Sequence, residues 1–189
     1  MLFRSVIDNF LEQKHFDFLS KVDFGKMKPK AWENYANSVE NGVVTNSSGH
    51  IPQDMLIDME KAYNPKLMKI LEELAPNLVK HVTHSDIILT AIGKDLMFHL
   101  HTDVKSKLLS TVVYITPEKN SGTLLYNTRI DAKHGTDEEE IEWKQNRAFI
   151  FSRTDTSWHN YKADGINPRV VLVYNLRTKN PNFKQKDEY

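Results

Sequence analysis

The sequence predicts a mainly β fold with flanking helices, arranged as a sandwich or barrel. After about residue 84, seven or eight short segments rich in β-branched and aromatic residues recur roughly every 8–15 residues, which is typical of such folds. Helical periodicity is confined to the first half, so we expect the helices to pack outside the sheet. No repeat or linker divides the 189 residues, a length that suits one domain with a substantial core.

Short apolar runs and turn residues define the elements expected near the N-terminus. Residues 2–7 predict a short strand, and Asp8 is placed to cap a helix near residues 9–20 whose apolar residues partly follow a 3.6-residue period. Residues 23–54 mix polar and apolar residues around turn-rich stretches. They predict loops with one irregular strand.

Two helices are expected to follow. Residues 53–61 have a helical pattern, and Pro65 suits the first turn of a second helix, where its missing N–H costs nothing. The apolar stripe of this second helix comprises Leu67, Ile70, Leu71, Leu74, Leu78 and Val79. Residues 1–83 are therefore expected to form a helical N-terminal support region.

The expected β core spans residues 84–178. Residues 108–116 are the clearest strand, because β-branched and apolar residues fill almost every position. Residues 93–95 predict a turn, and the acidic stretch 137–142 predicts a solvated turn. Further extended segments are expected at 87–92, 96–103, 123–126, 147–152, 159–162 and 169–176. The polar residues 181–189 predict a frayed tail.

Composition excludes several classes of protein. The 25 basic and 25 acidic residues balance, which gives no support for a nucleic-acid or anionic-membrane surface. The chain has no cysteine, so any metal must be held by His, Asp or Glu. No stretch has the length and apolarity of a signal peptide or a membrane span. We therefore expect a soluble cytoplasmic protein without membrane contact.

His101, Asp103 and His159 form a candidate metal site. On an extended chain His101 and Asp103 point to the same face, about 6.6–7 Å apart at the backbone, so both side chains can reach one ion. His159 would come from another strand. Two imidazoles and one carboxylate fill three positions of an octahedral ion and leave others open, as in non-haem Fe(II) oxygenases.

Arg169 is the second candidate functional residue. It opens the run Val170-Val171-Leu172-Val173-Tyr174, which is apolar on both faces and therefore expected to be buried. A charged residue leading into such a strand needs a partner. That partner is either a diacid ligand held by a bidentate contact or an Asp or Glu of the protein in a structural ion pair.

His99 is a competing metal ligand, because it alternates with His101. The span from His99 to Asp103 is roughly 13 Å on a strand, too long for all three residues to bind one ion. A His99-x-His101 pair is similar to that of the cupins, but the glutamate that typically follows is replaced by Val-Lys-Ser-Lys. We interpret His99 as a pocket residue or an exposed one.

The sequence resembles the Fe(II)/2-oxoglutarate-dependent dioxygenases, specifically their prolyl-4-hydroxylase-like branch. The likeness covers most of the chain, except residues 23–54, and Ser121 stands where the family has the first glycine of a Gly-Gly-x-Leu turn. The residues that carry it are Val6-Ile7-Asp8-Asn9-Phe10-Leu11, Phe98, His101-Thr102-Asp103, Thr111-Val112-Val113-Tyr114-Ile115, Ser121-Gly122-Thr123-Leu124, residues 146–151, Trp158-His159 and Arg169.

This resemblance implies a double-stranded β-helix, the jelly-roll or cupin-like barrel. It implies an enzyme that uses Fe(II) and the cosubstrate 2-oxoglutarate to hydroxylate a substrate with release of succinate and CO₂, with ascorbate maintaining Fe(II). The metal ligands would be His101, Asp103 and His159. Arg169 would bind the distal carboxylate of 2-oxoglutarate, and Tyr114 is either a donor to the same group or a core aromatic residue.

Substrate and partners are less constrained. A small molecule, a peptide or a protein is expected, with a prolyl or other amino-acid residue among the candidates. Nucleic acid is disfavoured, because the dealkylating branch carries a second arginine six residues after the first, and this chain has Asn175 there. Two alternatives are a cupin-like metalloenzyme without 2-oxoglutarate and a non-catalytic metal-binding module. The sequence does not indicate the oligomeric state.

Overall fold

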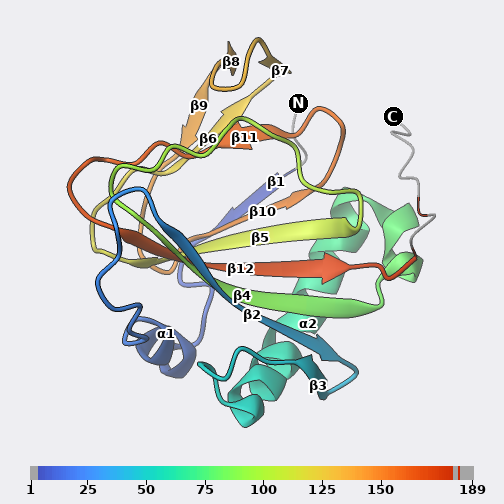
Figure 1. Cartoon of the computed structure of the whole chain (residues 1–189). Coiled ribbons are helices and arrows are strands. Elements are labelled where there is room, and N and C mark those ends of the chain that lie inside the picture. The colour runs from blue at the N-terminus through green and yellow to red at the C-terminus, as the bar shows by residue number, and fades with distance from the viewer. Residues whose placement is uncertain (1–3, 181–182, 184–189) are drawn as a thin grey trace.

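Two antiparallel sheets face each other in the computed structural model, which describes residues 4–180 and 183 (Figure 1). The larger sheet has seven strands in the order β1-β10-β5-β12-β4-β2-β3, and the smaller has three in the order β11-β6-β9. The larger sheet contains β1 (Arg4–Ile7), β2 (Trp32–Glu40), β3 (Val43–Asn46), β4 (His84–Ile92), β5 (Lys107–Thr116), β10 (Ala148–Ser152) and β12 (Arg169–Arg177). The smaller contains β6 (Thr123–Tyr126), β9 (Glu139–Ile141) and β11 (Trp158–Asn160), and β7 (Thr128–Arg129) pairs with β8 (Gly135–Thr136) as a separate ribbon.

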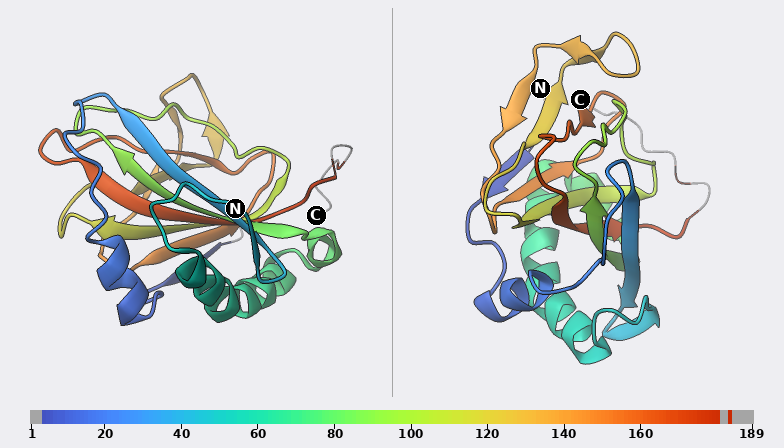
Figure 2. Two further views of the ribbon diagram at one scale, coloured as in Figure 1. Left: turned by 60° about the horizontal axis from the view of Figure 1, so that its bottom comes forward. Right: turned by 60° about the vertical axis from the view of Figure 1, so that its left-hand side comes forward.

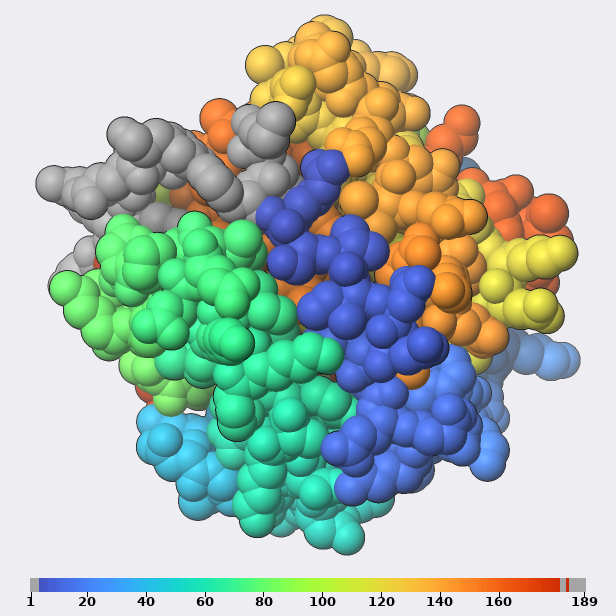
Figure 3. All heavy atoms as spheres, turned by 180° about the vertical axis from the view of Figure 1, so that it is seen from behind, coloured from blue at the N-terminus to red at the C-terminus, as the bar shows by residue number. Residues whose placement is uncertain are grey.

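The helices cover the face of the larger sheet that points away from the smaller sheet (Figure 2). They are α1 (Gln13–Leu19), α2 (Gln53–Leu74) and a 3₁₀ helix, η1 (Pro76–His81). From behind, the N-terminal segment and α2 lie side by side over this face (Figure 3). The prediction that the helices pack outside the sheet is confirmed. None of the helices in the described part of the chain combines the length and apolarity needed to span a membrane.

The prediction of two helices around Pro65 is wrong, because α2 continues through this residue. Proline in a helix interior removes one backbone hydrogen bond and costs about 3 kcal/mol. The stripe on α2 is nevertheless continuous, with Leu56, Met59, Leu67 and Leu71 fully buried. Each such side chain contributes about 1.5–3 kcal/mol on burial, so the packing of the unbroken helix outweighs the lost bond.

The support region is not purely helical, since residues 32–46 form two strands of the larger sheet. β2 pairs with β4 from Trp32 to Val39, where the sequence predicts loops with one irregular strand. β2 has polar residues on both faces and therefore lacks an apolar–polar alternation. Trp32 and Asn34 of this strand line a cavity, whereas Val39 is buried in the core on the other side.

Two further expectations near the chain's acidic residues are wrong. Asp8 does not cap a helix: α1 begins only at Gln13, and the Asp8 carboxylate pairs with Arg147 at 2.7 Å and with Lys144 at 2.7 Å. Asn9 breaks any earlier helix, because its φ of 51° is left-handed. The predicted turn at 137–142 contains β9, which pairs with β6.

The alternating faces of the larger sheet separate the helix-side core from a cavity. On β12, Arg169, Val171 and Val173 line the cavity, whereas Leu172 and Tyr174 pack into the core that includes α2. Successive side chains of a strand point to opposite faces, so one nearly continuous apolar strand supplies both layers. The predicted strands at 108–116, 123–126 and 169–176 are confirmed. Of the predicted tail, residues 181–182 and 184–189 lie outside the described residues.

Candidate active site

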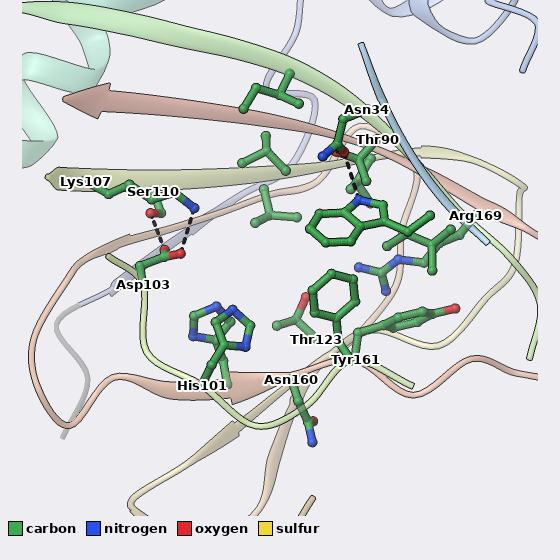
Figure 4. A pocket seen from close by; sticks show the side chains of 18 of the residues that line it. Asn34, Thr90, His101, Asp103, Lys107, Ser110, Thr123, Asn160, Tyr161 and Arg169 are labelled. Carbon is green, nitrogen blue, oxygen red and sulfur yellow. Dashed lines mark hydrogen bonds and ion pairs between the residues drawn. The ribbon is translucent and has the colours of Figure 1, made fainter. Parts of the chain in front are cut away.

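Three candidate metal ligands converge between the two sheets. The ligand atoms of His101, Asp103 and His159 lie within 4.8 Å of one another, and Figure 4 shows His101 and Asp103 pointing toward the same space. His159 belongs to β11, and the backbones of His101 and His159 form a single antiparallel bridge. Its two hydrogen bonds are 3.1 Å and 3.0 Å long, so the two imidazoles are fixed relative to each other.

Each histidine presents the same ring nitrogen to this space. His101 Nδ1 lies 2.8 Å from the carbonyl oxygen of His99, and His159 Nδ1 lies 2.9 Å from that of Ser157. A carbonyl oxygen only accepts hydrogen bonds, so both Nδ1 atoms carry the proton. Both Nε2 lone pairs are therefore available to an ion, with the ring orientation fixed by a backbone partner as is usual for metal-binding histidines.

The third ligand is buried and ionised. Lys107 Nζ donates to Asp103 Oδ1 at 2.7 Å, and Ser110 Oγ donates to Oδ2 at 2.5 Å. Burial raises the pKa of Asp103, but the charges of Lys107 and His159 and the hydrogen bonds from Lys107 and Ser110 together outweigh this effect, and the resulting pKa is about 2. Burial lowers the pKa of His159 to about 4, against the opposing effect of the Asp103 carboxylate. At neutral pH both groups are thus in the form that binds a cation.

His99 does not join the cluster. Its side chain is exposed, and only its carbonyl oxygen serves the site, by accepting the bond from His101. The expected strand at 96–103 is reduced to single bridges at Met97 and His101. The ligand atoms of His101 and Asp103 nevertheless lie within 4.8 Å of each other.

A cavity of about 220 Å³ contains these ligands and extends along the larger sheet. Its floor carries the apolar residues Ile88, Ile92, Val112, Phe151, Val171 and Val173. Its polar side chains include Asn34, Thr90 and Thr123, and Asn34 Oδ1 accepts hydrogen bonds from Trp32 and Thr90 at 2.8 and 2.7 Å. Lys107 and Arg169 lie at opposite ends of the view in Figure 4.

Arg169 is a buried cation without a carboxylate partner. Its exposed fraction is 3%, and no ion pair among residues 4–180 and 183 includes it. Nη1 donates to the carbonyl oxygen of Ser121 at 3.1 Å, while Nε has no hydrogen-bond partner in the described part of the chain. Burial lowers the pKa of the guanidinium, which nevertheless stays charged in proteins. The structural ion pair considered from the sequence is therefore absent among these residues.

Aromatic rings surround the same guanidinium. Its central carbon lies 3.5 Å from the ring centre of Tyr161 and 5.3 Å from that of Trp143. Such cation–π contacts offset part of the cost of burying the charge. They do not occupy the plane of the guanidinium, in which arginine binds carboxylates, and within the described residues its Nε–H is without an acceptor.

Tyr114 is fully buried and does not line the cavity. Its hydroxyl lies 2.9 Å from Thr123 Oγ1 and 3.1 Å from the carbonyl oxygen of Ile141, and it accepts a bond from the Thr123 N–H at 3.0 Å. These contacts fix Thr123, which does line the cavity. A direct contact of Tyr114 with a cosubstrate stays a prediction.

Gly122 sets the position of the segment beneath Arg169. A Cβ atom here would lie 1.9 Å from the carbonyl oxygen of Ile141, so Gly122→Ala must push β6 and β9 apart. We expect a loss of about 1–3 kcal/mol in the free energy of unfolding, measured by urea denaturation. Ser121→Gly is the control and should cost less than about 1 kcal/mol. Equal losses in the two variants would contradict this packing argument.

Several residues of the site were not predicted from the sequence. Lys107 and Ser110 hold Asp103, and Trp32 and Asn34 reach the cavity from β2. One signal was present: Ser110 interrupts the apolar strand at 108–116, and a buried hydroxyl needs a partner. Trp32 gave no comparable signal, because its strand lacks an apolar alternation.

Comparisons with known proteins identify the fold. No family model matches the sequence, and no curated protein matches it either. A prolyl-4-hydroxylase of Pseudomonas putida aligns over 95% of this chain and 94% of its own, with 12% identity and a TM-score of 0.58. A prolyl hydroxylase from Trichoplax adhaerens, solved with a hypoxia-inducible-factor peptide, aligns over 94% of this chain and 84% of its own, with 13% identity and a TM-score of 0.57.

A 2OG-Fe(II) oxygenase family oxidoreductase from Burkholderia pseudomallei aligns over 92% of this chain and 84% of its own, with 11% identity and a TM-score of 0.58. At such low identity these likenesses establish the fold alone. The predicted double-stranded β-helix is thereby confirmed. The chain combines this fold with an intact His101-x-Asp103…His159 cluster.

Proposed function

We propose that this chain is an Fe(II)- and 2-oxoglutarate-dependent oxygenase that hydroxylates its substrate. The observation that carries the proposal is Arg169, a buried guanidinium with no acidic partner among the described residues, lining the same cavity as the His–Asp–His cluster. A buried unpaired charge is strongly unfavourable. A carboxylate ligand is the natural partner for it.

The donor set fits Fe(II). Two imidazole nitrogens and one carboxylate are the ligands of the facial triad, which leaves three positions of an octahedral ion open. The ring orientations and the ionised Asp103 described above prepare His101, Asp103 and His159 for this role. A closed tetrahedral zinc site would need a fourth protein ligand, and no further His, Asp or Glu of the described chain belongs to the cluster.

The other end of the cavity fits 2-oxoglutarate. This dianion has a distal carboxylate that the Arg169 guanidinium would bind, with Nε–H as a donor that has no acceptor among the described residues, while the carbonyl oxygens of Ser121 and Gly122 orient the guanidinium. Thr123, held by Tyr114, lines the same space. When bound, Fe(II) and 2-oxoglutarate supply the oxidising chemistry that consumes O₂ and yields succinate and CO₂. The protein's part is to orient them and exclude water.

For the substrate we propose a chemical class and no individual compound. Two of the structurally similar proteins are described as prolyl hydroxylases, and a peptide, protein or small molecule with a prolyl or other amino-acid group is compatible with the site. Nucleic acid is disfavoured, since net charge is zero and Asn175 replaces the second arginine of the dealkylating branch. We further propose that the protein works in the cytoplasm and needs ascorbate to keep iron reduced.

Purified protein tests the proposal directly. With Fe(II), 2-oxoglutarate, ascorbate and O₂, it should form succinate even without a substrate, because uncoupled turnover needs only these components. Chelation of the metal should stop the reaction, and re-addition of Fe(II) should restore it. Succinate formation no faster than in the chelated sample would contradict the oxygenase and favour a non-catalytic metal-binding module.

A further inference from the structure

Lys107 is a cation in the cavity that the proposed chemistry does not use. It begins β5, its side chain is 22% exposed, and it lines the cavity beside the metal cluster. Nζ makes one hydrogen bond to the described residues, the 2.7 Å bond to Asp103 Oδ1. A lysine ammonium has three N–H donors, so two remain for a ligand.

The charges of the cavity do not balance without such a ligand. Among the described residues, the only charged side chains that line it are Asp103, Lys107 and Arg169, and metal-bound histidines are neutral. These side chains sum to one positive charge. A divalent ion and the 2-oxoglutarate dianion cancel each other, so the loaded cavity keeps the same single positive charge. A low-dielectric cavity strongly favours its neutralisation by an anion.

The location of this charge separates it from the cosubstrate. Arg169 and Lys107 lie at opposite ends of the cavity with His101 and Asp103 close to Lys107 (Figure 4). Between them runs an apolar row in which Val112, Val173 and Ile88 are neighbours on adjacent strands, and all three line the cavity. A molecule bound at Lys107 therefore lies against aliphatic side chains next to the metal.

We propose that the substrate of this site is an aliphatic monocarboxylate whose carboxylate is bound by Lys107. The inference rests on the proposed function and deepens it. The single negative charge neutralises the cavity, and the apolar row accommodates the hydrocarbon part that carries the reacting C–H bond. A metal ion bound to Asp103 would partly neutralise its carboxylate, which would leave the Lys107 ammonium available to the substrate. The carboxylate can belong to a free small molecule or to an acidic side chain of a peptide.

Binding to the loaded but inactive protein tests this inference. Calorimetric titration of the Mn(II)- and 2-oxoglutarate-loaded protein would use straight-chain carboxylic acids of four to six carbons and N-acetyl-L-valine, each beside its carboxamide. A capped peptide with one internal glutamate, beside its glutamine counterpart, forms the peptide arm. In at least one arm we expect the carboxylate to bind about ten-fold or more tightly than the amide, the effect of one charge-assisted hydrogen bond. The arm that responds identifies the source.

Variants assign the effect to Lys107. Lys107→Met should abolish the preference for carboxylate over amide, and Lys107→Arg should retain part of it. Lys105→Met, an exposed lysine two residues away that does not line the cavity, should behave as the wild type. The Mn(II) affinity of every variant is measured first, so that loss of metal is not mistaken for loss of substrate.

Two results would overturn the inference: equal binding of carboxylates and amides by the wild type, including no binding of either, or a preference that survives Lys107→Met. The succinate assay on the wild type separates this failure from that of the proposed function. A protein that makes succinate but shows no carboxylate preference is an oxygenase of another substrate class. A protein that makes no succinate contradicts the oxygenase itself.

Discussion

His101→Ala is expected to abolish metal-dependent succinate formation and to weaken Mn(II) binding by more than about 100-fold. Changes in residues that merely orient metal ligands cost 10–100-fold, and this variant removes a ligand itself. The His101–His159 backbone bridge does not need the imidazole, so the fold should persist, with an unchanged circular dichroism spectrum. Mn(II) affinity, followed by electron paramagnetic resonance, measures the loss independently of turnover.

His99→Ala is the matched control for this experiment. His99 lies two residues away, its side chain is exposed, and it contributes only a backbone carbonyl to the site, which alanine retains. Metal affinity and succinate formation should stay within about two-fold of the wild type, as for surface substitutions. If His99→Ala removed the metal as completely as His101→Ala, the ligand assignment would be wrong and the cupin-like His99-x-His101 pair would be favoured.

Arg169→Met should raise the KM for 2-oxoglutarate by about 30-fold or more, since truncating one partner of a buried, hydrogen-bonded charge pair costs about 2–5 kcal/mol. The same change should leave the stability of the ligand-free protein equal or higher. Its guanidinium has an unpaired Nε and no acidic partner among the described residues, and a methionine of similar volume removes a desolvated charge. Steady-state kinetics and urea denaturation measure the two effects.

The combination of effects separates a ligand-binding arginine from a structural one. A structural arginine would show the reverse pattern, with lost stability and an unchanged KM, and that result would favour a cupin-like enzyme that does not use 2-oxoglutarate. Arg169→Lys provides the conservative comparison. It keeps the charge but loses the planar fork, so its KM should lie between those of the wild type and Arg169→Met.

The sequence predicted those strands and helices in which the pattern of apolar residues follows the burial of the side chains. β5 and β12 are apolar on both faces because one face meets the helices and the other meets the cavity or the smaller sheet. β2 escaped prediction for the opposite reason: its partners are the polar rim of the cavity and backbone groups of β4. Pro65 misled because local backbone chemistry indicates a helix start, whereas the buried stripe of α2 depends on tertiary packing.

The candidate site divides in the same way. His101, Asp103, His159 and Arg169 were predicted because their residue types imply chemistry and their order along the chain is distinctive. Lys107 and Ser110 were not, because a lysine and a serine are common residues whose meaning here depends on their distance from Asp103. The absence of an acidic partner for Arg169 among the described residues likewise depends on the folded arrangement.

The single bridge between His101 and His159 ties the chemistry to the mechanics of the chain. Two of the three ligands sit on segments that are joined by two isolated bridges and not by a continuous ladder, and segments without a continuous ladder open more readily than the core. A metal that binds only the closed arrangement stabilises it by mass action. A bound ion would therefore suppress local opening of the segments that carry His101 and His159, and removal of the ion would make this opening more frequent.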